Sequence, residues 1–220
     1  MFFNNCNGLG MYNLRHLNSP RNHISLSCSK NIHVWGLRLI APGDSPNTDG
    51  SLGENGEFAT VEEVRVKNCT FTNTQNGVRI KTFQANGSGY ARKISFEDIN
   101  MVASENPVII DQKYNNHGSK NGRLNSYQSS HLTSSLGEAR SKSVNGKGVK
   151  VSDVRYTRIH GSSASDQAIT LNCDADLGCA NIVMDHVNMV SATSGHKVFA
   201  SCNNAHGSYV SSLASCLTKG

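Results

Sequence analysis

The sequence predicts an all-β chain wound as a parallel β-helix, in which each coil adds short strands to long parallel sheets. Three observations predict it. Five segments place apolar residues at alternate positions around an internal polar pair, and this period of two indicates strands. Most of the segments recur at intervals of about 30 residues, which indicates a solenoid. Only 17% of residues are charged, and Gly, Asn and Ser are abundant, which favours a turn-rich β architecture.

The five predicted long strands cover residues 32–39, 64–71, 94–101, 149–156 and 182–189. A second, shorter strand is predicted at 77–82, 107–111 and 167–173. A helical solenoid would need a period of 3.6, which is absent, and the Asn-Gly pairs lie between coils rather than inside hairpins. Asn31, Asn68 and Asn181 recur beside the long strands and are interpreted as stacked asparagine turns.

The interval between the third and the fourth long strand is nearly twice the others. It includes a tract, 115–147, that is rich in Ser, Asn, Lys and Gly and has almost no apolar periodicity. We expect this tract to be a poorly ordered insertion in a single domain that spans residues 1–220.

The cysteines and sequons are typical of a secreted protein. Of seven cysteines, two pairs have the spacing of short disulfide loops, Cys173 with Cys179 and Cys202 with Cys216. Cys69 is expected to be a buried free thiol, and Cys6 and Cys28 have no short-range mate. Glycosylation sequons begin at Asn68 and Asn86. The first residues lack the basic start and apolar region of a signal peptide, so we expect the chain to begin inside a longer protein.

Charge and hydropathy exclude some classes of function. No apolar stretch approaches ~20 residues, so no membrane span is predicted. The net charge of +5 suits a polyanionic partner. No run of Lys and Arg interleaves with aromatic residues, which argues against nucleic acid.

The turn at residues 45–50, Ser-Pro-Asn-Thr-Asp-Gly, follows the first apolar run and the breaker pair Pro42-Gly43. Its one carboxylate, Asp49, lies among small hydrogen-bonding residues, and such an Asp ordinarily caps its own turn.

Three stretches in order, 41–50, 76–82 and 106–114, resemble the plant polygalacturonases, the pectin-cutting glycoside hydrolases built on a right-handed parallel β-helix. The resemblance covers roughly 1–114 and 146–217. It implies a secreted, monomeric cell-wall enzyme without cofactor or metal, which hydrolyses α-1,4-galacturonosyl bonds of pectin with inversion, from chain ends or internally.

Four residues match the family's functional positions. The resemblance implies that Asp49 is catalytic, that Arg79 and Lys81 hold the substrate carboxylate, and that Tyr114 lines the groove. From the residues alone, Arg79 and Lys81 would be solvated side chains on one strand face, and Tyr114 a surface tyrosine.

Two parts of the family's machinery are missing. Inversion needs an acid and a base ~6.5–9.5 Å apart, and the family supplies an adjacent Asp pair followed by a Gly-His-Gly histidine. No two Asp are adjacent here, and His117, His160 and His206 all come after Arg79, on the wrong side of that motif. Ser51-Leu52-Gly53, which the family places about two coils later, follows Gly50 directly. We infer that coils are missing at the Gly50–Ser51 junction and predict little or no activity.

Two alternatives stay open. The chain could be a non-catalytic pectin-binding module that uses Arg79, Lys81 and Tyr114 without cleavage. It could also be a truncated product with no stable fold, because an uncapped β-helix end invites aggregation. A pectate lyase would need clustered carboxylates for calcium, and the sequence has none in the required pattern.

Overall fold

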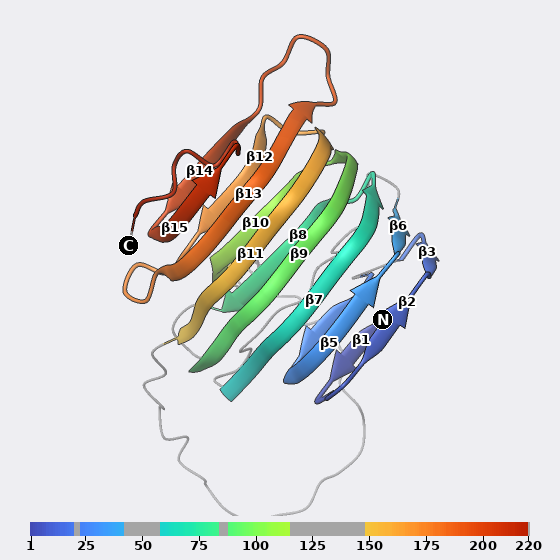
Figure 1. Ribbon diagram of the computed structural model, residues 1–220, viewed down its shortest axis with the longest axis vertical. Coiled ribbons are helices and arrows are strands. Elements are labelled where there is room, and N and C mark those ends of the chain that lie inside the picture. The colour runs from blue at the N-terminus through green and yellow to red at the C-terminus, as the bar shows by residue number, and fades with distance from the viewer. Residues whose placement is uncertain (20–22, 42–57, 84–87, 115–147, 220) are drawn as a thin grey trace, which may run out of the picture.

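The computed structural model describes residues 1–19, 23–41, 58–83, 88–114 and 148–219. These residues form fifteen strands and no helix (Figure 1). Accordingly, this part of the chain offers no helix that could cross a membrane. The strands are β1 (Phe2–Asn4), β2 (Gly10–Tyr12), β3 (Arg15–Leu17), β4 (Ser25–Ser27), β5 (Ser29–Trp35), β6 (Arg38–Ile40), β7 (Phe58–Thr72), β8 (Asn76–Phe83), β9 (Ser88–Ser104), β10 (Asn106–Tyr114), β11 (Gly148–Ser163), β12 (Gln167–Asn172), β13 (Cys179–Ser191), β14 (Phe199–Asn203) and β15 (Ala205–Val210).

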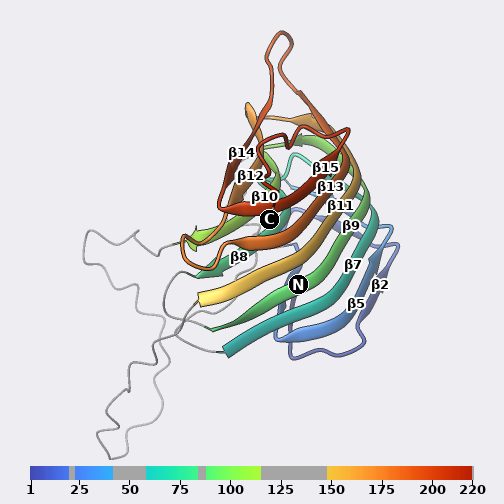
Figure 2. The ribbon, with the colours of Figure 1, turned by 60° about the vertical axis from the view of Figure 1, so that its left-hand side comes forward.

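All strand pairs are parallel, and the strands stack coil upon coil, which confirms the predicted parallel β-helix. A nine-stranded sheet has the order β15-β13-β11-β9-β7-β5-β2, with β3 paired to β6 and β6 to β7. A four-stranded sheet has the order β14-β12-β10-β8, and β1 pairs with β4. Figure 2 shows the long strands curving around one side of the four-stranded sheet. The termini lie at opposite ends of the stack (Figure 1).

The long strands turn corners at residues with left-handed backbone conformation. One row of corners contains Asn31, Glu63, Lys93, Asp153 and Asn181, all with φ between 53° and 57°. Asn tolerates this conformation better than most residues, because its short side chain hydrogen-bonds locally. Asn181 donates to Asp153 on the preceding coil at 2.7 Å, so the row is also linked along the stack. The predicted asparagine turns are present, although Asn68 belongs to a second row of corners.

The core is a column of aliphatic side chains that point into the solenoid. Ile32, Val64, Ile94, Val154 and Ile182 are in register from β5 to β13 and are at most 5% exposed. Burying each such side chain contributes about 1.5–3 kcal/mol.

The register corrects one prediction from the sequence, in which Val149 began the strand that corresponds to the one beginning at Ile94. Residues 149–156 do lie in a strand, but Ile94 pairs with Val154, well beyond the predicted start at Val149. Val149 pairs with Gly89 instead. Apolar alternation continues on both sides of the corner at Asp153, so a period of two cannot identify which residue begins the repeat.

The nine-stranded sheet continues across the Gly50–Ser51 junction. Ile32 of β5 pairs with Val64 of β7, and Leu39 of β6 pairs with Phe71. The sheet is therefore continuous from β5 and β6 to β7, and each coil contacts mainly its neighbours, as in other solenoids. In the described part of the chain, β4 and β8 do not pair with each other.

Two disulfides close the C-terminal coils. Cys173 is joined to Cys179 beyond β12, with their Cα atoms 5.6 Å apart. Cys202 of β14 is joined to Cys216, with a Cα separation of 5.4 Å. Cys6, Cys28 and Cys69 are free thiols, and Cys69 is buried. Burial is the main cause that raises the pKa of the Cys69 thiol, so this group stays protonated and packs as a small apolar residue.

Tyr156 carries a prediction about stability. Its ring stacks on Phe96 at a centroid distance of 5.3 Å, and its hydroxyl is fully buried without a hydrogen-bond partner among the described residues. A buried unsatisfied polar group costs about 1–3 kcal/mol. We expect Tyr156→Phe to raise the free energy of unfolding by about 1 kcal/mol in urea denaturation. A destabilised variant would show that the hydroxyl has a partner.

Candidate functional site

The outer face of the four-stranded sheet presents two rows of side chains. Arg79, Ile109, Thr170 and Ser201 are in register in one row. Two residues further along the strands, a parallel row contains Lys81, Asp111, Asn172 and Asn203. Residues between the rows, such as Ile80 and Ile110, point inward and are buried, because successive side chains of a strand alternate between faces. Apart from Ile109, the two rows are polar, and their cations, Arg79 and Lys81, both lie on β8.

Arg79 is held by a carboxylate on the next coil. Its in-register neighbour is Ile109, but its Nη2 reaches diagonally to Oδ2 of Asp111 at 3.1 Å. The two side chains are only 13% and 19% exposed, so water screens this ion pair less than a surface pair. Asp111 also pairs in register with Lys81, which places one carboxylate beside two cations.

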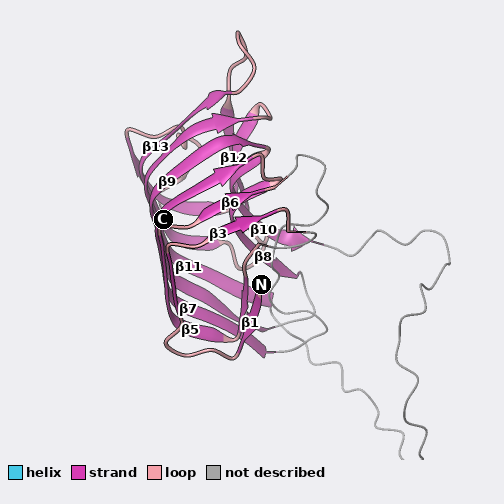
Figure 3. Cartoon of the chain, turned by 90° about the vertical axis from the view of Figure 1, so that its right-hand side faces the viewer, coloured by secondary structure: helices cyan, strands magenta, loops and turns pink. Residues whose placement is uncertain are grey.

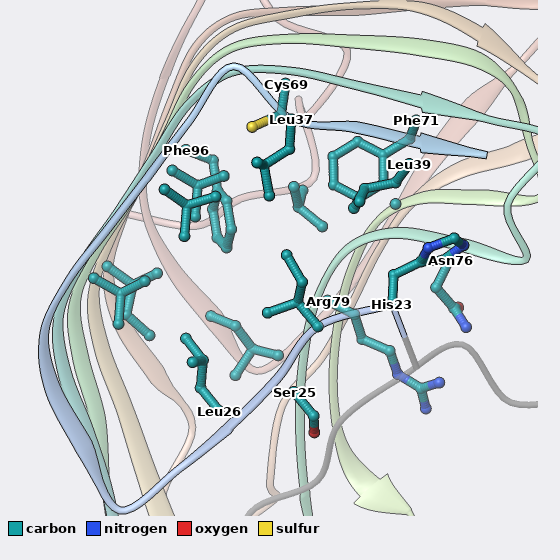
Figure 4. Close-up of a pocket in the computed structure, with 18 of the residues that line it drawn as sticks. His23, Ser25, Leu26, Leu37, Leu39, Cys69, Phe71, Asn76, Arg79 and Phe96 are labelled. Atoms are coloured by element: carbon teal, nitrogen blue, oxygen red, sulfur yellow. The ribbon is translucent and has the colours of Figure 1, made fainter. Parts of the chain in front are cut away.

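A cavity of about 170 Å³ opens beside β8. Its interior is apolar and includes Leu37, Cys69 and Phe96. Figure 4 shows His23, Ser25 and Asn76 at one side of this cavity, with Arg79 pointing away from the apolar side chains. Residues of both β4 and β8 line the cavity, although these two strands do not pair with each other in the described part of the chain.

His23, at the cavity wall, pairs with His16. Their Nδ1 atoms are 3.0 Å apart and their rings meet edge to face. When both rings are neutral, one Nδ1 can carry the proton and donate it to the other Nδ1, which accepts. Burial, followed by the repulsion of His16 and of the N-terminal ammonium, lowers the pKa of His23 to about 4. Burial is also the main cause that lowers the pKa of His16.

This pair predicts a loss of stability in mild acid. Between pH 6.5 and 4 the unfolded chain binds a proton at His23 that the folded protein does not, so unfolding is favoured as pH falls through this window. The pKa difference sets an upper limit of about 3 kcal/mol. We expect His23→Gln to flatten the curve of unfolding free energy against pH between 6.5 and 4. His33→Gln, on an exposed site, should leave the curve unchanged, and equal curves for all three proteins would refute the assignment.

The predicted site residues fall in different places. Arg79 and Lys81 lie on the same outer face of β8. Tyr114 is the last residue of β10. Asp49 and Asn86 lie outside the described residues, as do His117 and the predicted insertion at 115–147. Asn68 is exposed at a corner of β7.

Other acidic and histidine residues have local roles. Asp174 accepts hydrogen bonds from the backbone N–H groups of Asp176 and Leu177 and so caps the loop that the Cys173–Cys179 disulfide closes. His160 is exposed on β11, and His206 contacts Thr218. Within the described ranges, no three His, Cys, Asp or Glu side chains gather as a metal site would require.

Asp111 is the site residue that the sequence did not identify. It belongs to the 106–114 stretch, but its contact with Arg79 depends on how adjacent coils align. The signal available in the sequence is the offset: Arg79 and Asp111 are 32 residues apart, close to one coil.

Comparison with known proteins identifies relatives. The model of glycosyl hydrolases family 28 matches residues 1–51, 50–135 and 137–216. A probable polygalacturonase of Arabidopsis thaliana is 32% identical over 93% of this chain and 52% of the relative. A polygalacturonase of Prunus persica is 29% identical over 93% of this chain and 58% of the relative, and an exopolygalacturonase of Zea mays is 29% identical over 87% and 54%. The chain thus spans about half the length of these relatives.

Proposed function

This chain belongs to the glycosyl hydrolases of family 28, and on that premise we propose that it binds polygalacturonate, the de-esterified chain of pectin. The observation that carries the proposal is the pair Arg79 and Lys81 on the outer face of β8, with Asp111 beside them. The polymer is inferred from the names of the relatives, which are polygalacturonases. The positive charges of Arg79 and Lys81 suit the carboxylates of that polymer.

The face suits a uronate chain. A guanidinium can hold a carboxylate with two parallel hydrogen bonds, and an ammonium adds a compact charge. A guanidinium also has five N–H donors, more than one carboxylate can accept. Thr170, Asn172 and Asn203 continue the polar rows over the next coils and offer hydrogen bonds to sugar hydroxyls. We assign Tyr114, at the end of β10, to the same substrate-binding face.

We propose that this chain binds polygalacturonate but hydrolyses it slightly or not at all. Inversion requires an acid and a base ~6.5–9.5 Å apart. On β8, β10, β12 and β14, the only carboxylate in the described part of the chain is Asp111, and it is already bound by Arg79. Asp49 alone cannot serve as both acid and base.

The comparisons support the loss of coils at the junction. Two matched segments of the family model meet at residues 50 and 51. The alignment with the Arabidopsis relative runs over 255 positions, whereas 93% of 220 residues is about 205. About 50 positions therefore face gaps in this chain, enough for more than one coil of about 30 residues.

The first candidate is thus a polygalacturonase-like enzyme with slight activity, and the second is a pectin-binding module with no catalytic role. The second is favoured by Asp111, the one carboxylate on β8, β10, β12 and β14 in the described part of the chain, because Arg79 already binds it. Both candidates place the protein outside the cell, in the cell wall, as a monomer. The two disulfides support an oxidising compartment.

The test measures binding and cleavage together. The folded protein is titrated with polygalacturonate by calorimetry and then assayed for new reducing ends, beside Asp49→Asn. Saturable binding without reducing ends is the expected result. Cleavage that Asp49→Asn abolishes would show that another acid completes the pair and would overturn the proposed loss of activity. Soluble, folded protein that binds no polygalacturonate would overturn the proposed function itself.

A further inference from the structure

Two arginines of like charge stand side by side near the N-terminal end of the solenoid. Arg15 of β3 pairs in register with Arg38 of β6, so their Cα atoms occupy adjacent rungs, ~4.8 Å apart. Both side chains are exposed. Like charges directly opposite each other on paired strands are destabilising.

This pair is the exception among the described strands. Every other in-register pair of Asp, Glu, Lys and Arg on the described strands joins opposite charges. These pairs are Lys30 with Glu62, Glu62 with Arg92, Lys67 with Glu97, and Lys81 with Asp111. The first three also form ion pairs, at 3.2, 2.9 and 3.0 Å. Where charged residues of neighbouring described strands meet in register, a cation therefore faces an anion, except at Arg15 and Arg38, where two cations meet.

The two arginines border a hollow of about 380 Å³. Asn13, Asn68 and Thr70 also line it, and none of the described residues that line it is an Asp or a Glu. Among the residues that the structure describes, neither Arg15 nor Arg38 has an ion-pair or hydrogen-bond partner for its side chain. The hollow thus combines two guanidinium groups with amide and hydroxyl donors.

We propose that this hollow binds an oxyanion between Arg15 and Arg38. A carboxylate or sulfate group there would accept charge-assisted hydrogen bonds from both guanidiniums and remove their mutual repulsion. In protein without a glycan on Asn68, the side chains of Asn13, Asn68 and Thr70 would bind the remainder of the ligand. The volume falls in the range of about 300–1,000 Å³ typical of small-molecule pockets, so the hollow has room for a sugar that carries the anionic group.

The hollow is separate from the outer face of β8 that carries Arg79. β3 and β6 join the nine-stranded sheet, where β6 pairs with the end of β7, whereas Arg79 lies on the four-stranded sheet (Figure 3). The inference therefore does not depend on the proposed function. Asn68 begins a glycosylation sequon, and a glycan there would start inside the hollow, so the test uses protein produced without N-glycans.

The test uses two probes, inorganic sulfate and trigalacturonate. Each is titrated by calorimetry against the wild type, Arg15→Gln and Arg38→Gln. Arg155→Gln is the matched control, because it removes the same charge from an exposed site on β11. At low salt we expect at least one probe to bind at this site, at least tenfold more weakly in both hollow variants, and unchanged in Arg155→Gln. Thermal unfolding without probe should show the two variants to be as stable as the wild type or more so, since repulsion is removed.

The two probes distinguish the sources of the anion. Sulfate binding alone assigns the hollow to a free inorganic anion, and tighter binding of trigalacturonate assigns it to a sugar-borne carboxylate. Trigalacturonate binding that survives in Arg79→Gln but not in Arg38→Gln would support the hollow even if the proposed function of the β8 face failed. Binding of neither probe, or equal weakening in Arg155→Gln, would overturn the proposal.

Discussion

Replacing Gln112 with leucine is expected to lower the free energy of unfolding by about 3 kcal/mol or more. The Gln112 side chain is only 1% exposed, and its Nε2 donates to the backbone carbonyl of Val149 at 2.7 Å. Its Oε1 accepts from the backbone N–H of Asp174 at 3.2 Å. Leucine would leave both backbone groups buried without partners, and each such loss costs about 1–3 kcal/mol. The measurement is urea denaturation followed by circular dichroism.

Gln167→Leu is the matched control for this prediction. Gln167 of β12 is half-buried, and its amide donates to the hydroxyl of Thr170, a side chain that can instead bond to water. We expect Gln167→Leu to change the unfolding free energy by less than about 1 kcal/mol. If the two variants were equally stable, Val149 and Asp174 would have other hydrogen-bond partners in the variant. Gln112 would then not be the residue that ties β10 to the following coils.

Replacing Arg79 with glutamine is expected to weaken the binding of polygalacturonate by about 10- to 100-fold. A hydrogen bond to a charged group contributes about 1.5–3 kcal/mol, and each 1.4 kcal/mol is about tenfold in affinity. Arg79→Lys should be intermediate, because lysine keeps the charge but cannot hold a carboxylate with two parallel bonds. Calorimetry with polygalacturonate at fixed, low salt measures both effects.

Arg155→Gln serves again as the control, since it lowers the net charge equally on another face of the protein. If it weakened binding as much as Arg79→Gln, the polymer would be attracted by overall charge and not by the β8 face. Thermal unfolding of Arg79→Gln is measured in parallel, because the change leaves Asp111 without its ion-pair partner. A variant that melts with the wild type and binds normally would contradict the assignment of Arg79.

Much of the fold was predictable because a solenoid is built from local repeats. Alternation of apolar residues located the long strands, and the repeat interval of about 30 residues indicated their stacking. The spacing of Cys173 with Cys179 and of Cys202 with Cys216 corresponds to the two disulfides of the structure. The exact register was less accessible. Val154, not Val149, pairs with Ile94, since the corner at Asp153 leaves no mark in the apolar pattern.

The sequence by itself determined the fold class, the family resemblance, and the placement of Arg79 and Lys81 on one strand face, since all three depend on residues close together in the chain. Only the tertiary structure decided which charges meet across coils. Asp111 reaches Arg79, and Arg15 stands beside Arg38, because the register of one coil on the next brings together residues that are far apart in the chain. A contact of that kind depends on the length of every turn between its partners, which apolar periodicity does not specify.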